Sequence, residues 1–196
     1  MDGLNTKLFL WLHQGAGQQP IQDILAVFFA EGGPYILMLT LVVCWLLVRG
    51  QRRLALLEAT EASLLGLLIN QVVGLVIYHP RPYMIGLCNP LIAHGPENSF
   101  PSDHVTLILA VSLSLLLRRG WRGVGLALLA TAVATGWGRI YAGIHFPLDM
   151  VGSLLVALSA SGILLWQRKL VTPLNEQLVK TYHRLAMYLL NRLRSS

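Results

Sequence analysis

The sequence predicts an all-α fold, a polytopic membrane helix bundle of five transmembrane helices, or six if the N-terminal segment also crosses the bilayer. Hydrophobic residues make up 55% of the 196 residues, charged residues only 12%, and the mean hydropathy is +0.59. This composition is more apolar than that of soluble proteins. Several apolar stretches also reach the roughly 20 residues that cross a bilayer core. The length suits a single membrane-embedded domain, residues 1–196.

The positive charges indicate which helix ends face the cytoplasm. Twelve of the 15 Lys and Arg residues fall in three groups, at residues 49–53, at residues 118–122 and from Arg168 onward. Each group lies at the end of an apolar stretch, as is typical of cytoplasmic ends. The net charge of +6 therefore reflects membrane topology, and we expect no nucleic-acid partner.

Both ends of the chain predict interfacial helices. In the N-terminal segment, residues 1–20, apolar side chains recur at helical spacing at Leu4, Leu8, Trp11 and Leu12. The tail, residues 168–196, carries an apolar stripe at Leu174, Leu178, Tyr182, Leu185, Leu189 and Leu193, interleaved with Lys180, Arg184, Arg192 and Arg194. We expect this basic amphipathic tail to lie on the anionic cytoplasmic leaflet.

The first transmembrane segment, residues 21–48, is interrupted by Glu31-Gly32-Gly33-Pro34. Such an interruption indicates a kink whose freed backbone groups bond to neighbours or face a polar cavity. Glu31 either lines a substrate cleft or marks a helix end near the headgroups. Both interpretations are compatible with the sequence.

Four further apolar segments follow, at residues 54–78, 104–117, 123–137 and 147–166. The first of these carries Asn70 and Gln71, which we expect to bond to other helices rather than to substrate. Counting from the basic turns places two polar connections opposite the cytoplasm, residues 79–103 and 139–146. Residues 79–103 contain five prolines and no helical period, and a loop of this length predicts an outer active-site loop.

His145 and Asp149 are four residues apart, and Pro147 suits the first position of a helix. One helical turn brings the carboxylate under the imidazole. A carboxylate on one ring nitrogen leaves the other nitrogen basic, which is the arrangement of a nucleophile with its orienting group. Arg139 is placed to hold an anion nearby. A structural His–Asp pair is the alternative interpretation of this spacing.

A second cluster opens the segment that starts at residue 104. Ser102 or Asp103 suits a helix N-cap, and free amides at a helix start favour an anion such as phosphate. His104 falls in the first turn, where it can donate a proton to a leaving group. Arg81 lies between two prolines, and its planar guanidinium matches phosphate oxygens bidentately. Taken singly, a plain cap and a headgroup-bound arginine explain these residues equally well.

Together these residues predict one chemistry. Arg81 and Arg139 are the only arginines on the predicted outer side, and both fall within the polar clusters. The clusters supply a nucleophile, an acid, an orienting carboxylate and two cations. This combination favours phosphoryl transfer from a lipid ester through a phosphohistidine, with charge stabilised by arginine and helix amides.

The chain resembles the type 2 phosphatidic acid phosphatase superfamily, whose three motifs are Lys-x6-Arg-Pro, Pro-Ser-Gly-His and Ser-Arg-x5-His-x3-Asp. Residues 79–83, His-Pro-Arg-Pro-Tyr, and residues 99–104, Ser-Phe-Pro-Ser-Asp-His, are most similar to the bacitracin-resistance type of undecaprenyl pyrophosphate phosphatase. The resemblance covers residues 70–155 well. It implies an extracytoplasmic site that removes one phosphate from the C55 lipid carrier without a metal or other cofactor.

By position in these motifs, His145 is the implied nucleophile, Asp149 its activating carboxylate and His104 the proton donor to the leaving group. The implied phosphate cradle consists of Arg81, Arg139, Ser102 and Asp103. The implied partners are a polyprenyl pyrophosphate lipid and the bilayer, and the sequence does not indicate an oligomeric state.

Three residues depart from the motifs. Gly74 stands where the motif has its lysine, Asp103 replaces the usual glycine, and Gly138 replaces the serine before Arg139. The missing lysine leaves the distal phosphate with one cation fewer. We expect compensating substrate contacts from among His79, Tyr83 and His94.

The expected protein is a multi-pass phosphatase of the bacterial inner membrane, with its active site facing the periplasm or the cell exterior. Alternative functions are a phosphatase for another lipid such as phosphatidylglycerol phosphate, a phosphotransferase acting on lipid A, and a non-catalytic lipid transporter. Release of inorganic phosphate and its dependence on an acceptor distinguish these functions.

Overall fold

The computed structural model describes residues 3–195, apart from the side chains of residues 189–191 and 193–195. This part of the chain contains α-helices, one short 3₁₀ turn and no strand. The α-helices are α1 (Gly3–His13), α2 (Pro20–Leu47), α3 (Arg52–Val76), α4 (Asp103–Leu116), α5 (Arg122–Tyr141), α6 (Pro147–Trp166) and α7 (Arg168–Ser195), and the 3₁₀ turn η1 is Pro82–Ile85. The all-α prediction is confirmed.

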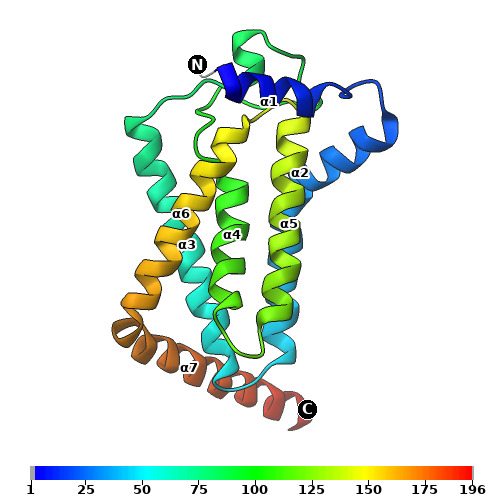
Figure 1. The fold of residues 1–196 in the computed structure, drawn as a ribbon. Coiled ribbons are helices and arrows are strands. Elements are labelled where there is room, and N and C mark those ends of the chain that lie inside the picture. Colours follow the sequence, from blue (N-terminus) through cyan, green and yellow to red (C-terminus); the bar gives the residue numbers. More distant parts are fainter. Residues whose placement is uncertain (1–2, 196) are drawn as a thin grey trace.

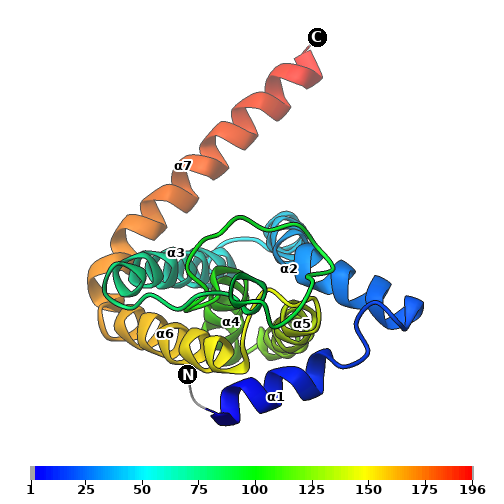
Figure 2. The same ribbon diagram turned by 90° about the horizontal axis from the view of Figure 1, so that it is seen from above.

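Helix α4 lies at the centre of the bundle (Figures 1 and 2). It packs against α2, α3, α5 and α6, while α2 contacts α5 and α3 contacts α6 along their lengths. Its apolar side chains Ile108, Val111 and Leu115 are fully buried because neighbours cover it on all sides. The predicted site residues at the start of α4 are therefore held at the centre of one end of the bundle.

Four of the described helices, α2, α3, α5 and α6, are long and apolar enough to cross a membrane. The chain is accordingly a multi-pass membrane protein. The central helix α4 is apolar but has 14 residues, fewer than the roughly 20 of a full span. Helix α1 has 11 residues and lies across the end of the bundle, so the N-terminal segment does not add a sixth member (Figure 1).

One interpretation of Glu31 is excluded, and one predicted boundary is wrong. Helix α2 continues through Glu31 and Pro34, so Glu31 does not mark a helix end, and the first turns of α2 run obliquely to the rest, as the predicted kink requires (Figure 1). Helix α5 extends to Tyr141 because the Ala142 amide still donates to the Gly138 carbonyl, at 2.8 Å. Arg139 therefore lies in the last turn of a helix rather than in the predicted outer loop.

Helix α7 starts at the end of the bundle opposite α1 and extends outward beyond the other helices (Figures 1 and 2). Arg168 Nε lies 3.3 Å from Glu58 Oε1 and ties the start of α7 to α3. The described members of the predicted apolar stripe are exposed at Leu174, Leu178 and Leu185, whereas Tyr182 packs against Trp45. The side chains of Leu189, Leu193 and Arg194 lie outside the described residues. The location of this helix on a lipid leaflet stays a prediction.

Candidate active site

The turn between α5 and α6 pairs His145 with Asp149. Pro147 opens α6, and the Asp149 carboxylate accepts the Phe146 amide at 2.8 Å, which caps the helix. His145 Nδ1 lies 3.1 Å from Asp149 Oδ2. Both side chains are buried, at 2% and 0% exposure, so the pair is shielded from competing water. The structure thus forms the contact that the four-residue spacing predicts.

Two further side chains bond to the Asp149 carboxylate. Ser99 Oγ donates to Asp149 Oδ2 at 2.5 Å, and His79 Nδ1 lies 3.1 Å from Oδ1. His79 was expected among the substrate contacts, but it faces the carboxylate. Sequence reasoning did not single out Ser99, although it begins the segment at residues 99–104. No local signal identifies these contacts, because they join residues 50 and 70 positions apart.

Arg81 reaches the other side of the His145 ring. Its Nη1 donates to His145 Nε2 at 3.1 Å and to the Ile144 carbonyl at 2.9 Å. Because Nε2 accepts a hydrogen bond from Arg81, the neutral ring carries its hydrogen on Nδ1, which donates to Asp149. Burial, reinforced by Arg139, keeps the pKa of His145 well below its ordinary value, although the bond to Asp149 opposes this shift. The imidazole is therefore neutral and its Nε2 carries a lone pair, as a nucleophile requires.

A cleft of about 370 Å³ opens at the same end of the bundle. It is lined by Glu31, Pro34 and Tyr35 of α2, by Ile92 and His94 of the loop, and by His104 and Arg139. Glu31 therefore lines a cleft, as one of its two interpretations held. Arg139 Nη2 lies 3.4 Å from His94 Nε2. Burial, together with the charge of Arg81, lowers the pKa of His94, so this ring is neutral beside the two arginines.

The start of α4 is fixed by α6 and α3. Ser153 Oγ accepts the Ser102 amide at 2.9 Å and donates to the Ser102 carbonyl at 3.0 Å. Asp103 Oδ1 accepts from Asn70 Nδ2 at 2.8 Å, which confirms the expected helix–helix role of that amide. The Ser102 hydroxyl and Arg139 Nε are buried without a protein partner among the described residues. Both are donors that an anion can satisfy.

Comparison with known proteins places the chain in a family. The sequence profile of the PAP2 superfamily matches residues 55–172. The chain belongs to the PAP2 superfamily. It is 33% identical over 179 residues to the undecaprenyl-diphosphatase BcrC of Bacillus subtilis, covering 91% of this chain and 92% of that protein.

Two more similarities extend this result. The chain is 32% identical over 170 residues to the putative undecaprenyl-diphosphatase YbjG of Escherichia coli, covering 85% of each. The crystal structure of Aquifex aeolicus LpxE superimposes with a TM-score of 0.69 at 25% identity, covering 84% of this chain and 96% of that one. The bundle is thus a PAP2-type membrane fold.

The Asn98 side chain lies beside Gly74, where the motif has its lysine. A Cβ on Gly74 would lie 3.3 Å from Asn98 Nδ2, so the Asn98 side chain occupies the space beside residue 74. That amide donates to the Ile77 carbonyl at 2.7 Å, and its oxygen accepts the His79 amide at 2.8 Å. Asn98 therefore joins the loop to the residues that follow α3. Tyr83, a predicted substrate contact, donates its hydroxyl to the Gly95 carbonyl at 2.6 Å.

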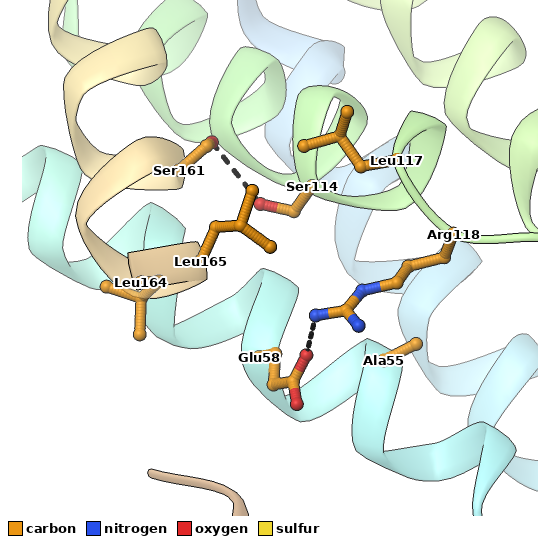
Figure 3. A pocket seen from close by; sticks show the side chains of 8 residues that line it. All are labelled: Ala55, Glu58, Ser114, Leu117, Arg118, Ser161, Leu164 and Leu165. Atoms are coloured by element: carbon orange, nitrogen blue, oxygen red, sulfur yellow. Dashed lines mark hydrogen bonds and ion pairs between the residues drawn. The ribbon is translucent and has the colours of Figure 1, made fainter. Parts of the chain in front are cut away.

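A second hollow lies at the opposite end of the bundle, beside Glu58 and Arg118 (Figure 3). At about 20 Å³ it has room for roughly one water molecule and none for a phosphate group. Arg118 donates to Glu58 across it, and Ser114 bonds to Ser161 (Figure 3). This hollow is a structural joint, and the cleft beside Arg139 is the candidate site.

Proposed function

We propose that the protein hydrolyses undecaprenyl pyrophosphate to undecaprenyl phosphate and inorganic phosphate. The observation that carries the proposal is the His145 ring, which is bonded to Asp149 at Nδ1 and faces Arg81 at Nε2. An imidazole held in this way attacks only through Nε2, at the point where an arginine can also hold the phosphoryl oxygens. The similarity to two undecaprenyl-diphosphatases supports the choice of substrate.

In the first step, His145 Nε2 attacks the terminal phosphorus, and the P–O bond to the bridging oxygen breaks. His104 donates a proton to the departing lipid phosphate. Arg81, Arg139, the Ser102 hydroxyl and the amides at the start of α4, including that of Asp103, balance the charge of the transferring group. As the substrate enters, Arg81 gives up its hydrogen bond to His145 Nε2 and donates to a phosphate oxygen instead.

In the second step, water attacks the phosphohistidine, the N–P bond breaks and phosphate leaves. His104, now deprotonated, accepts the proton from water, since it acts as acid and then as base. Among the described residues there is no group of three or more His, Cys, Asp or Glu side chains arranged to hold a metal ion. The metal-free reaction stays part of the proposal.

The topology inferred from charge supports a site on the extracytoplasmic face of a bacterial inner membrane. The basic residues 49–53 and 118–122 connect helices at the end opposite the cleft. Accessibility labelling of single cysteines in cells at His94 and at Arg119 tests this orientation. Labelling of position 94 from outside and protection of position 119 are expected, and the reverse pattern contradicts it.

The function is tested with purified protein in detergent and a panel of lipids: C55 pyrophosphate, C15 pyrophosphate, phosphatidylglycerol phosphate and phosphatidic acid. Phosphate release from C55 pyrophosphate without an acceptor, lost in His145→Ala, is the expected result. Preference for phosphatidylglycerol phosphate assigns another lipid, and release only with a lipid A acceptor assigns a transferase. If no lipid yields phosphate, the remaining alternative is a non-catalytic lipid transporter.

A further inference from the structure

Pro34, inside α2, leaves a backbone carbonyl without its helical hydrogen bond, and Arg139 donates to that carbonyl. Pro34 has no N–H, so the carbonyl of Ala30, four residues earlier in α2, lacks its helical donor. Arg139 Nη1 donates to that carbonyl at 2.9 Å. The kink predicted at Pro34 thus frees a backbone group that a neighbouring helix satisfies, and the donor is the arginine of the candidate site.

This bond anchors one side of the Arg139 guanidinium to α2. Arg139 is 3% exposed, and its Nη2 faces His94 Nε2 at 3.4 Å. Its Nε is buried and has no protein partner among the described residues. With Nη1 anchored on α2, the edge formed by Nε and Nη2 is left for substrate: Nε has no protein partner among the described residues, and Nη2 exchanges His94 for a phosphate oxygen.

Two glycines make the contact between α2 and α5 close enough for this bond. A Cβ on Gly138 would lie 2.5 Å from the Ala26 carbonyl oxygen, and a Cβ on Gly33 would lie 2.2 Å from Thr135 Oγ1. Neither position tolerates a larger residue without separating the helices. The departure of residue 138 from the serine of the PAP2 motif is explained by this contact.

We propose that Pro34 is a positioning residue for catalysis, because the Ala30 carbonyl that it leaves free holds Arg139 with its phosphate-binding edge toward the substrate. The inference rests on the proposed function. It assigns α2, which carries none of the PAP2 motifs, a part in aligning the transferred phosphoryl group.

The direct test is Pro34→Ala. The new N–H competes for the Ala30 carbonyl, so Arg139 loses its anchor and kcat/KM for C55 pyrophosphate falls about tenfold, the size expected for loosening one charged contact. The inhibition constant of orthovanadate, a phosphate analogue, rises by a similar factor. Pro173→Ala is the matched control, because Pro173 lies inside α7 at the far end of the bundle and its replacement leaves both constants unchanged.

A double-mutant cycle separates positioning from general damage to the fold. In an Arg139→Ala background the guanidinium that Pro34 positions is absent, so adding Pro34→Ala lowers kcat/KM no further. An equal tenfold loss in both backgrounds overturns the proposal, as does unchanged vanadate inhibition in Pro34→Ala. If Pro34→Ala does not fold, as judged by its thermal transition, Pro34→Gly introduces the same N–H and is put through the same cycle with the same expected outcomes.

The outcomes distinguish this inference from the function on which it rests. If the wild-type protein releases no phosphate from any lipid, the proposed function is ruled out. If the wild-type protein is active and Pro34→Ala has the same kcat/KM and the same vanadate inhibition constant, only the positioning role of Pro34 is ruled out.

Discussion

The Asp149 carboxylate is held by four donors: the imidazoles of His145 and His79, the Ser99 hydroxyl and the Phe146 amide. A fully buried carboxylate keeps its charge only where donors replace its hydration. Ser99 and His79 therefore stabilise the charge that orients His145. The His–Asp spacing identifies the pair in the sequence, whereas the two additional donors come from distant segments.

Asp149→Asn tests the orienting charge. The amide keeps the shape of the site but no longer favours the tautomer with a basic Nε2, so turnover should fall on the order of 10²–10⁴-fold. Steady-state phosphate release at saturating C55 pyrophosphate measures the effect. Glu97→Gln is the control, because Glu97 is an exposed carboxylate of the same outer loop. Turnover of Asp149→Asn within twofold of the wild type would contradict the assigned role.

His94 is the expected substitute for the missing motif lysine. It lines the cleft beside Arg139, whereas His79 faces Asp149 and Tyr83 donates to loop carbonyls. His94→Ala should raise KM for C55 pyrophosphate about tenfold with little change in kcat, since a charge-assisted hydrogen bond is worth about 1.5–3 kcal/mol. His79→Ala should lower kcat instead, because it acts through Asp149. Full activity in both variants rules out compensation by either histidine.

At the level of elements, hydropathy and basic turns were sufficient to predict the five helices of the bundle and the two terminal helices. The end of α5 was misplaced, because apolar character stops near Trp137 while backbone hydrogen bonds continue to Tyr141. The kink of α2 at Pro34 was predictable, whereas the identity of the partner of the Ala30 carbonyl, the Arg139 guanidinium 109 residues away, depends on tertiary packing. The site residues were predictable by type and spacing, but their partners depend on tertiary packing.

Glu58 joins α3 to the turn after α4 and to the start of α7. Glu58 is 7% exposed and bonds to Arg118 and Arg168. Glu58→Gln leaves those cations underpaired and should lower the free energy of unfolding by about 1–3 kcal/mol. Thermal unfolding in detergent measures this loss, and kcat should be unchanged because the joint lies opposite the cleft.

Glu176→Gln is the matched control for the joint. Its ion pair with Lys180 is exposed, with the lysine side chain at 71%, and exposed pairs contribute little. An equal loss of stability in both variants would show that the Glu58 joint has no special role.

For the whole molecule, the fold separates two polar ends by a hydrocarbon-facing bundle. The three PAP2 motifs come from the loop before α4, from the start of α4 and from the α5–α6 junction, and they meet at one end around the central helix (Figure 2). The basic turns and α7 occupy the other end (Figure 1). The separation lets a lipid present its headgroup to the cleft while its chain stays in the bilayer.

A covalent intermediate on His145 is the central claim, and trapping it is the most direct test. The protein is mixed with C55 pyrophosphate carrying ³²P in the terminal phosphate, quenched in alkali within one turnover and digested for peptide mapping. Label in the peptide that contains His145, absent from His145→Ala, is the expected result. Rapid turnover with no label on that peptide, together with inversion at phosphorus in isotopically chiral substrate, would show that water attacks directly and that His145 is not the nucleophile.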